Sequence, residues 1–169
     1  KVIAACNEAA HVKATCCIGG EAEIEALPDR TTTLQRLVES NVAFYSQVFT
    51  ESEAVTAGEE TQVLEVEKLK EMLIRCDKVS LLNALKDALA NRTAMKILSE
   101  RTLYLMQQEM LQVVYAHLAE AGVQATRLFA DDNSVRLAEQ ACRSAVDMIR
   151  WANYLLERTF ACNEELRKA

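Results

Sequence analysis

Residues 134–167 read SVRLAEQACRSAVDMIRWANYLLERTFACNEELR, a stretch that contains neither glycine nor proline. Small or apolar residues recur in it at alternating intervals of three and four: Ala138, Ala141, Ala145, Met148, Ala152, Leu155, Thr159 and Cys162. This spacing is typical of a helix that packs lengthwise against other helices. We predict one continuous helical rod from Ser134 to Arg167, roughly 50 Å long, around which the rest of the chain is organised.

The composition favours a few long helices. The chain has 169 residues, of which 50% are apolar and 26% are charged, close to ordinary globular usage. Four glycines and one proline leave few places for turns, whereas the 25 alanines and 19 glutamates are strong helix formers. We predict an all-α protein with a single domain over residues 1–169, an elongated antiparallel bundle of three to five long helices stapled by disulfides.

The N-terminal third predicts two helices. A small-residue helix is expected over residues 1–18, followed by a turn at Leu27-Pro28-Asp29, because proline biases the residue before it away from helical geometry. Thr32 and Gln35 have the spacing of a capping box, so a second helix is expected to begin near Thr32 or Thr33. Its broad apolar face would carry Leu34, Leu37, Val38, Phe44, Tyr45, Val48, Phe49 and Val55.

Two further helical patterns lie between residue 60 and the rod. The first predicts a single face made of Leu64, Leu69, Leu73, Cys76, Leu82, Leu85 and Leu89. The second places Ile97, Tyr104, Leu111 and Leu118 at strict seven-residue spacing, which favours lengthwise packing. Gly58 and Gly122 each fit either a helix break or a helix interior, because one glycine costs only about 1 kcal/mol inside a helix.

Six scattered cysteines are unusual for a cytosolic helical domain. We predict disulfides in a secretory compartment, and keep buried free thiols as the alternative, for Cys6, Cys16, Cys17, Cys76, Cys142 and Cys162. The adjacent Cys16 and Cys17 are expected to take different partners. Zinc is the least favoured interpretation, because the chain has no Cys-x-x-Cys and its two histidines, His11 and His117, are far apart.

Charge and sequence motifs limit the partners. The net charge of -6 argues against nucleic acid and against an anionic membrane surface, since both require clustered lysine and arginine. No apolar run approaches the roughly 20 residues that cross a bilayer. Asn91-Arg92-Thr93 is the only glycosylation sequon, so Asn91 is a glycosylation candidate if the chain passes through a secretory compartment.

No group of residues predicts a catalytic site. Glu8-x-x-His11 matches half of the carboxylate and histidine pattern of di-iron bundles, but His117 has Val114 in place of the second glutamate. A glycine-rich phosphate loop, a nucleophile elbow and a His-Glu-x-x-His motif are all missing. We therefore predict a protein that is not an enzyme and that binds no cofactor and no metal.

Trp151 is the only tryptophan and stands one position off the predicted rod's seam, beside Arg150 and near Tyr154. Core packing is the first interpretation of this residue. An interface anchor formed by Trp151, Arg150 and Tyr154 is the alternative, because these residue types dominate binding hot spots.

The chain resembles the ectodomains of trypanosome surface coat proteins. The features that carry the resemblance are an alanine seam at 138, 141, 145 and 152, an alanine-rich start at 4 to 14, six cysteines, a single tryptophan and one sequon. The chain is similar in pattern to the glutamic acid/alanine-rich protein of insect-stage African trypanosomes. Relatives of that family include the variant surface glycoproteins and the haptoglobin-haemoglobin receptor.

The resemblance implies an extracellular helical bundle on a GPI-type lipid anchor that lies outside this chain, packed densely as a cell-surface coat. Neighbouring coat copies and host or vector surface molecules are the partners that it implies. The alternative is a secreted helical module that binds a protein, a lipid or a small ligand. A third class is an intracellular bundle scaffold with free thiols.

Overall fold

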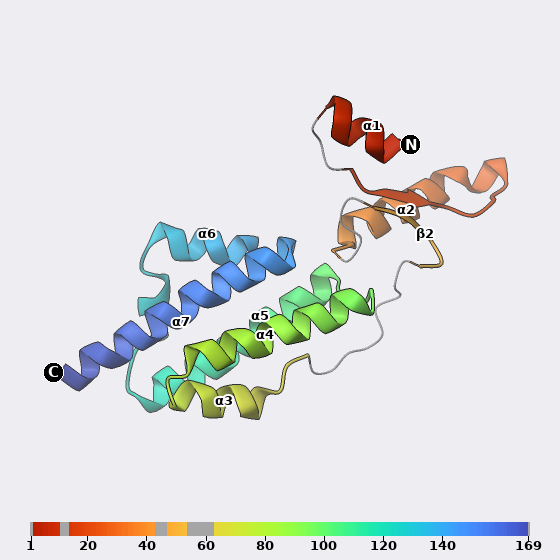
Figure 1. Ribbon diagram of the computed structural model, residues 1–169. Coiled ribbons are helices and arrows are strands. Elements are labelled where there is room, and N and C mark those ends of the chain that lie inside the picture. Colours follow the sequence, from red (N-terminus) through yellow and green to blue (C-terminus); the bar gives the residue numbers. More distant parts are fainter. Residues whose placement is uncertain (1, 11–13, 43–46, 54–62, 169) are drawn as a thin grey trace. The chain divides into compact units, whose positions relative to one another are not determined.

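The computed structural model describes residues 2–10, 14–42, 47–53 and 63–168. The chain forms two compact units (Figure 1). The N-terminal unit comprises residues 1–59 and 92–99, and the helical unit comprises residues 60–91 and 100–169. Each unit is described by itself, and the single domain predicted above stays a prediction.

The N-terminal unit combines short helices with a small parallel sheet. Its elements are α1 (Val2–Ala9), β1 (Cys16–Ile18), the 3-10 helix η1 (Ile24–Ala26), α2 (Leu27–Ser40) and β2 (Val48–Thr50). The strands pair Cys16 with Val48, Cys17 with Phe49 and Ile18 with Thr50. Phe49 and Leu98 are the buried apolar residues of the described part of this unit.

The helix predicted over residues 1–18 is wrong at Ala10 and at residues 14–18. Cys16 and Cys17 lie in β1 instead, where the Cys16 N–H donates to the Gln47 carbonyl at 3.0 Å. Strand pairing over a distance in the sequence overrides the local helix propensity there. Gly19 follows β1 and lies so close to α2 that a Cβ atom would stand 2.7 Å from the Leu34 side chain.

Helix α2 begins at Leu27, several residues before the predicted start near Thr32 or Thr33. Pro28 occupies the first turn, where the missing N–H breaks no helical hydrogen bond. The Thr32 hydroxyl donates to the Pro28 carbonyl at 3.0 Å, so the predicted capping box is wrong. The predicted long apolar face is also divided, because α2 ends at Ser40 and Val48 and Phe49 lie in β2. Some residues named in the prediction for this region lie outside the described residues: Phe44, Tyr45, Val55 and Gly58.

The helical unit carries most of the protein's core. Its elements are α3 (Val66–Ile74), α4 (Lys78–Ala94, in this unit up to Asn91), α5 (Glu100–Glu120), η2 (Ala125–Phe129), α6 (Asp132–Gln140), η3 (Ala141–Arg143) and α7 (Ala145–Lys168). Helix α5 packs against α3 and α7, and α6 lies along α7 (Figure 1). The prediction of a mostly helical, all-α protein is confirmed, apart from the two three-residue strands. The elongated antiparallel bundle stays a prediction.

The continuous rod predicted from Ser134 to Arg167 is wrong, because Ser144 interrupts it. Ser144 is extended (φ -158°, ψ 161°) and separates α6 and η3 from α7. Its hydroxyl accepts the Asp147 N–H at 3.1 Å and donates to the Asp147 carboxylate at 2.7 Å, which is a capping interaction. The predicted seam is nonetheless buried at Ala141, Met148, Ala152, Leu155, Thr159 and Cys162.

The pattern predicted from residue 60 onwards is likewise divided, at Cys76. This residue has φ +55°, and the Asp77 N–H donates to the Met72 carbonyl at 3.0 Å, as in a Schellman helix end. The Asp77 carboxylate then accepts the Ser80 N–H at 3.0 Å and caps α4. Because the register changes at this break, α4 buries Leu81, Leu85 and Leu89, and Cys76 is exposed.

Gly122 ends α5. Its φ is +72°, and the Val123 N–H donates to the Leu118 carbonyl at 2.8 Å. At the other end, the seven-residue spacing from Ile97 crosses a second such turn at Lys96 (φ +58°), so it does not describe one helical face. Tyr104 is accordingly 53% exposed. The buried residues of α5 are Thr102, Leu103, Met106, Gln107, Met110, Val113, Val114 and Leu118.

We predict that Ser144→Ala lowers the free energy of unfolding by about 0.5 to 2 kcal/mol, because the first turn of α7 loses its capping hydroxyl. Chemical denaturation followed by circular dichroism measures the change. Ser40→Ala, at the exposed end of α2, is the control and should leave stability nearly unchanged. Equal stability of Ser144→Ala and the unaltered protein would show that the cap does not set this helix boundary.

Candidate functional site

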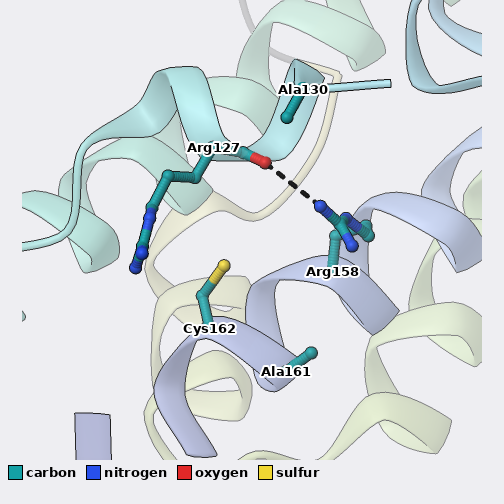
Figure 2. A pocket seen from close by; sticks show the side chains of 5 residues that line it. All are labelled: Arg127, Ala130, Arg158, Ala161 and Cys162. Carbon is teal, nitrogen blue, oxygen red and sulfur yellow. Dashed lines mark hydrogen bonds between the residues drawn. The ribbon is translucent and has the colours of Figure 1, made fainter. Parts of the chain in front are cut away.

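A depression of about 220 Å³ opens on the surface of the helical unit between η2 and α7 (Figure 2). Two arginines and three small residues line it: Arg127, Ala130, Arg158, Ala161 and Cys162. A neighbouring depression of about 320 Å³ shares Arg127 and is otherwise lined by Gly122, Val123 and Gln124. Arg127 therefore lines both depressions.

The local fold explains why these residues meet. The turn at Gly122 ends α5 and leads into η2, which is held by the buried Leu128. Phe129 adds an edge-on contact with Tyr115, with ring centroids 6.4 Å apart. On α7, Ala161 and Cys162 follow Arg158 by three and four positions, so all three lie on one helix face.

Asp131 is the hydrogen-bonding centre beside the depression. Its carboxylate accepts the Ser134 N–H at 2.8 Å as the N-cap of α6, and lies 2.9 Å from the Tyr154 hydroxyl. The Ser134 N–H, then the Tyr154 hydroxyl, and more weakly the Arg158 charge lower the pKa of Asp131 below its usual value. Asp131 is therefore ionised at neutral pH.

Arg158 is only partly satisfied by these neighbours. One terminal nitrogen of its guanidinium donates to the Arg127 backbone carbonyl at 3.3 Å (Figure 2). Its Nε atom lies 4.0 Å from the Asp131 carboxylate, is buried, and has no hydrogen-bond acceptor. The site thus contains one buried donor whose hydrogen-bonding capacity is unused.

The six cysteines are free thiols in the structure, so the predicted disulfides are not present. Cys142 donates to the Gln107 side chain at 3.4 Å, and its pKa is raised by burial and, to a lesser extent, by Glu100. Cys162 is only 6% exposed and lies at the depression. The others lie on α1 (Cys6), on β1 (Cys16 and Cys17) and at the exposed turn after α3 (Cys76).

The three residues proposed as an interface do not form one exposed surface. Trp151 is 1% exposed, which confirms the core interpretation and removes it as an accessible anchor. Arg150 is exposed, and its guanidinium lies 3.4 Å from the Asp147 carboxylate, whereas the Tyr154 hydroxyl donates a hydrogen bond to the Asp131 carboxylate. Asn91 is exposed on α4, and its glycosylation stays a prediction.

Of the two histidines, the structure describes only His117. His117 lies on α5, with its Nε2 atom 2.8 Å from the Asn163 side-chain nitrogen on α7, whereas His11 lies outside the described residues. Among the described residues, no group of three or more histidine, cysteine or acidic side chains is placed to hold a metal ion. No described helix is long and apolar enough to cross a membrane.

Comparison with protein-family models, with curated proteins and with solved structures finds no match to this chain. The trypanosome coat resemblance therefore depends on the pattern of residues alone. Sequence reasoning did not find Arg127 and Arg158. The four-residue spacing of Arg158 and Cys162 predicts that they lie on one helix face. The sequence does not predict that η2 packs beside that face, because this contact joins segments far apart in the chain.

We predict that the unfolding free energy rises with pH up to about 6.5 because of His117. Burial lowers the pKa of His117, and the opposing effect of Glu120 is smaller. The unfolded chain therefore binds a proton at a pH where the folded chain does not, so stability falls as pH drops below the unfolded value.

Denaturation at several pH values between 5 and 7.5, roughly the histidine range, measures this slope. His117→Gln should flatten it, and His11→Gln should not. The same slope in wild type and His117→Gln would contradict the assignment.

Proposed function

We propose that this protein is a non-enzymatic cell-surface coat glycoprotein of a parasite, similar to the glutamic acid/alanine-rich coat proteins of trypanosomes. It would form a protective layer, or a layer that meets host or vector molecules. The observation that carries the proposal is the buried seam that runs along η3 and α7. This feature suits a structural spacer better than a ligand-binding cavity.

The seam brings helices close together. Ala141 and Ala152 are fully buried, and their small side chains permit close approach of neighbouring backbones. Thr159 is also buried, but its hydroxyl donates to the Leu155 carbonyl at 2.8 Å and so remains satisfied. The two depressions described above are at or below the lower end of the 300 to 1,000 Å³ typical of small-molecule sites, roughly.

The surface of the helical unit is compatible with a dense coat. Ion pairs join α3 to α5 through Lys70 and Glu120, and α4 to α7 through Lys78 and Glu157. Asn91 is exposed and accessible to a glycosyltransferase if the chain enters the secretory pathway. The proposal further places the chain outside the cell on a GPI-type anchor, as an elongated bundle whose cysteines become oxidised there.

A secreted helical binding module is the second candidate. The arginine-lined depression between η2 and α7 favours it, because two guanidinium groups at one concave surface suit an anionic ligand. Under this alternative the chain would be released from the cell, without an anchor.

Antibodies against the chain test the two candidates on living cells of the source organism. The coat proposal predicts labelling without permeabilisation and release by a phospholipase C that cleaves GPI anchors. Labelling only after permeabilisation would contradict both extracellular candidates. Protein found only in the medium, with no lipase-releasable pool, would favour the binding module.

Intact mass of the protein purified from those cells gives a second readout. Alkylation with and without reductant counts disulfides, and Asn91→Gln tests whether Asn91 carries a glycan. We expect oxidised cysteines and a mass loss in Asn91→Gln. Six free thiols would point to the intracellular scaffold.

A further inference from the structure

A stripe of mostly apolar side chains runs from η1 along one face of α2. Helix η1 leads directly into α2, and the Leu27 N–H donates to the Ile24 carbonyl. Residues three apart in a 3-10 helix eclipse one another, so Ile24 and Leu27 lie on the same face. Thr31 and Leu34 follow Leu27 by four and seven positions and continue that face. Ile24, Leu27, Thr31 and Leu34 form what we call the α2 stripe.

Only one end of the α2 stripe is covered within the N-terminal unit. At Leu34 the helix packs on the end of β1, because a Cβ atom at Gly19 would stand 2.7 Å from the Leu34 side chain. At the other end Ile24 is 81% exposed and Leu27 is 48% exposed. The Thr31 hydroxyl between them and Leu34 donates to the Leu27 carbonyl at 2.8 Å, so it needs no partner from outside. The exposed end of the stripe is therefore an apolar surface.

Three carboxylates border this exposed end. Glu21 precedes η1, and Glu23 and Glu25 are the chain neighbours of Ile24 on either side. All three residues are exposed, and none of them forms an ion pair with a described residue. Negative charge is thus uncompensated around Ile24 and Leu27.

This charge decides which partner fits the stripe. A second copy of the chain would bring the same three carboxylates to the interface from both sides, and like charges in an interface repel. An anionic membrane would repel them for the same reason. A surface that carries lysine or arginine beside apolar side chains complements both features. Amphipathic helices present such surfaces, with anchors three, four and seven residues apart.

We infer that the α2 stripe binds a helix of another protein, one whose apolar face is bordered by lysine or arginine. Binding removes Ile24 and Leu27 from water. The cations of the partner lie beside Glu21, Glu23 and Glu25 and compensate their charge. This inference does not depend on the coat proposal, since either a coat protein or a secreted module can carry the stripe.

Titration of the full, isotope-labelled chain with a synthetic amphipathic helix of leucine and lysine tests the site. Nuclear magnetic resonance spectra report the backbone amides. We expect saturable shifts centred on residues 21–34, and an affinity loss of about tenfold or more in the double variant Ile24→Ser/Leu27→Ser. Glu23→Gln/Glu25→Gln should also bind more weakly, and its binding should depend less on salt.

Ile74→Ser/Val79→Ser is the matched control, because it replaces two apolar residues of the helical unit that are 55% and 69% exposed. It should bind the peptide like the unaltered protein, and equal losses in the two double serine variants would overturn the inference. If Ile24→Ser/Leu27→Ser loses helix content by circular dichroism, the single variant Ile24→Ser decides the outcome, since Ile24 lies outside α2.

Further probes separate this partner from other occupants. A peptide of the same composition in scrambled order lacks the apolar face and should bind more weakly; equal binding would overturn the inference, because charge alone would explain it. A peptide with glutamate in place of lysine should not bind, and binding as tight as that of the lysine peptide would also overturn it. Dimerisation of the chain, or binding to phosphatidylcholine vesicles, that is lost in Ile24→Ser/Leu27→Ser would overturn it in favour of a second copy or a membrane.

Discussion

Burial of one face of α7 is the constraint on which the helical unit depends. From Met148 to Cys162, side chains at intervals of three and four are removed from water, and Trp151 adds the largest apolar surface beside them. Helices α5 and α6 both pack on this helix. Each fully buried apolar side chain of this size contributes on the order of 1.5 to 3 kcal/mol, so the seam outweighs any single surface ion pair.

Polar side chains decide where the helices around α7 end. Ser144 caps α7 and Asp131 caps α6, so the chain folds back instead of continuing as a rod. Asp131 also binds Tyr154, which lies on α7 itself. The same carboxylate therefore stabilises the start of α6 and links it to α7 through Tyr154.

Residue patterns predicted the buried faces better than the ends of the helices. The seam of α7 followed from its spacing, but the break at Ser144 did not, although Ser144 and Asp147 have capping-box spacing. Cys76 and Lys96 end helices in a left-handed conformation that neither residue type favours, so these two helix ends could not be predicted from the residue type. Glycine does favour this conformation, so Gly122 was a recognisable candidate for a helix end. Contacts between segments far apart in the sequence pair β1 with β2 and bring Arg158 to the Arg127 carbonyl. Periodicity describes one segment at a time, so it could not predict either contact.

The described part of the N-terminal unit buries far fewer apolar side chains than the helical unit. Phe49 and Leu98 are its buried apolar residues in the described part, and α2 buries none.

Amide hydrogen exchange of the native protein tests the central role of α7 most directly. We expect the slowest exchange at α7 amides from Ala152 to Thr159 and in α5, and faster exchange in α1 and α2. Exchange of α7 amides as fast as those of α2 would contradict the account.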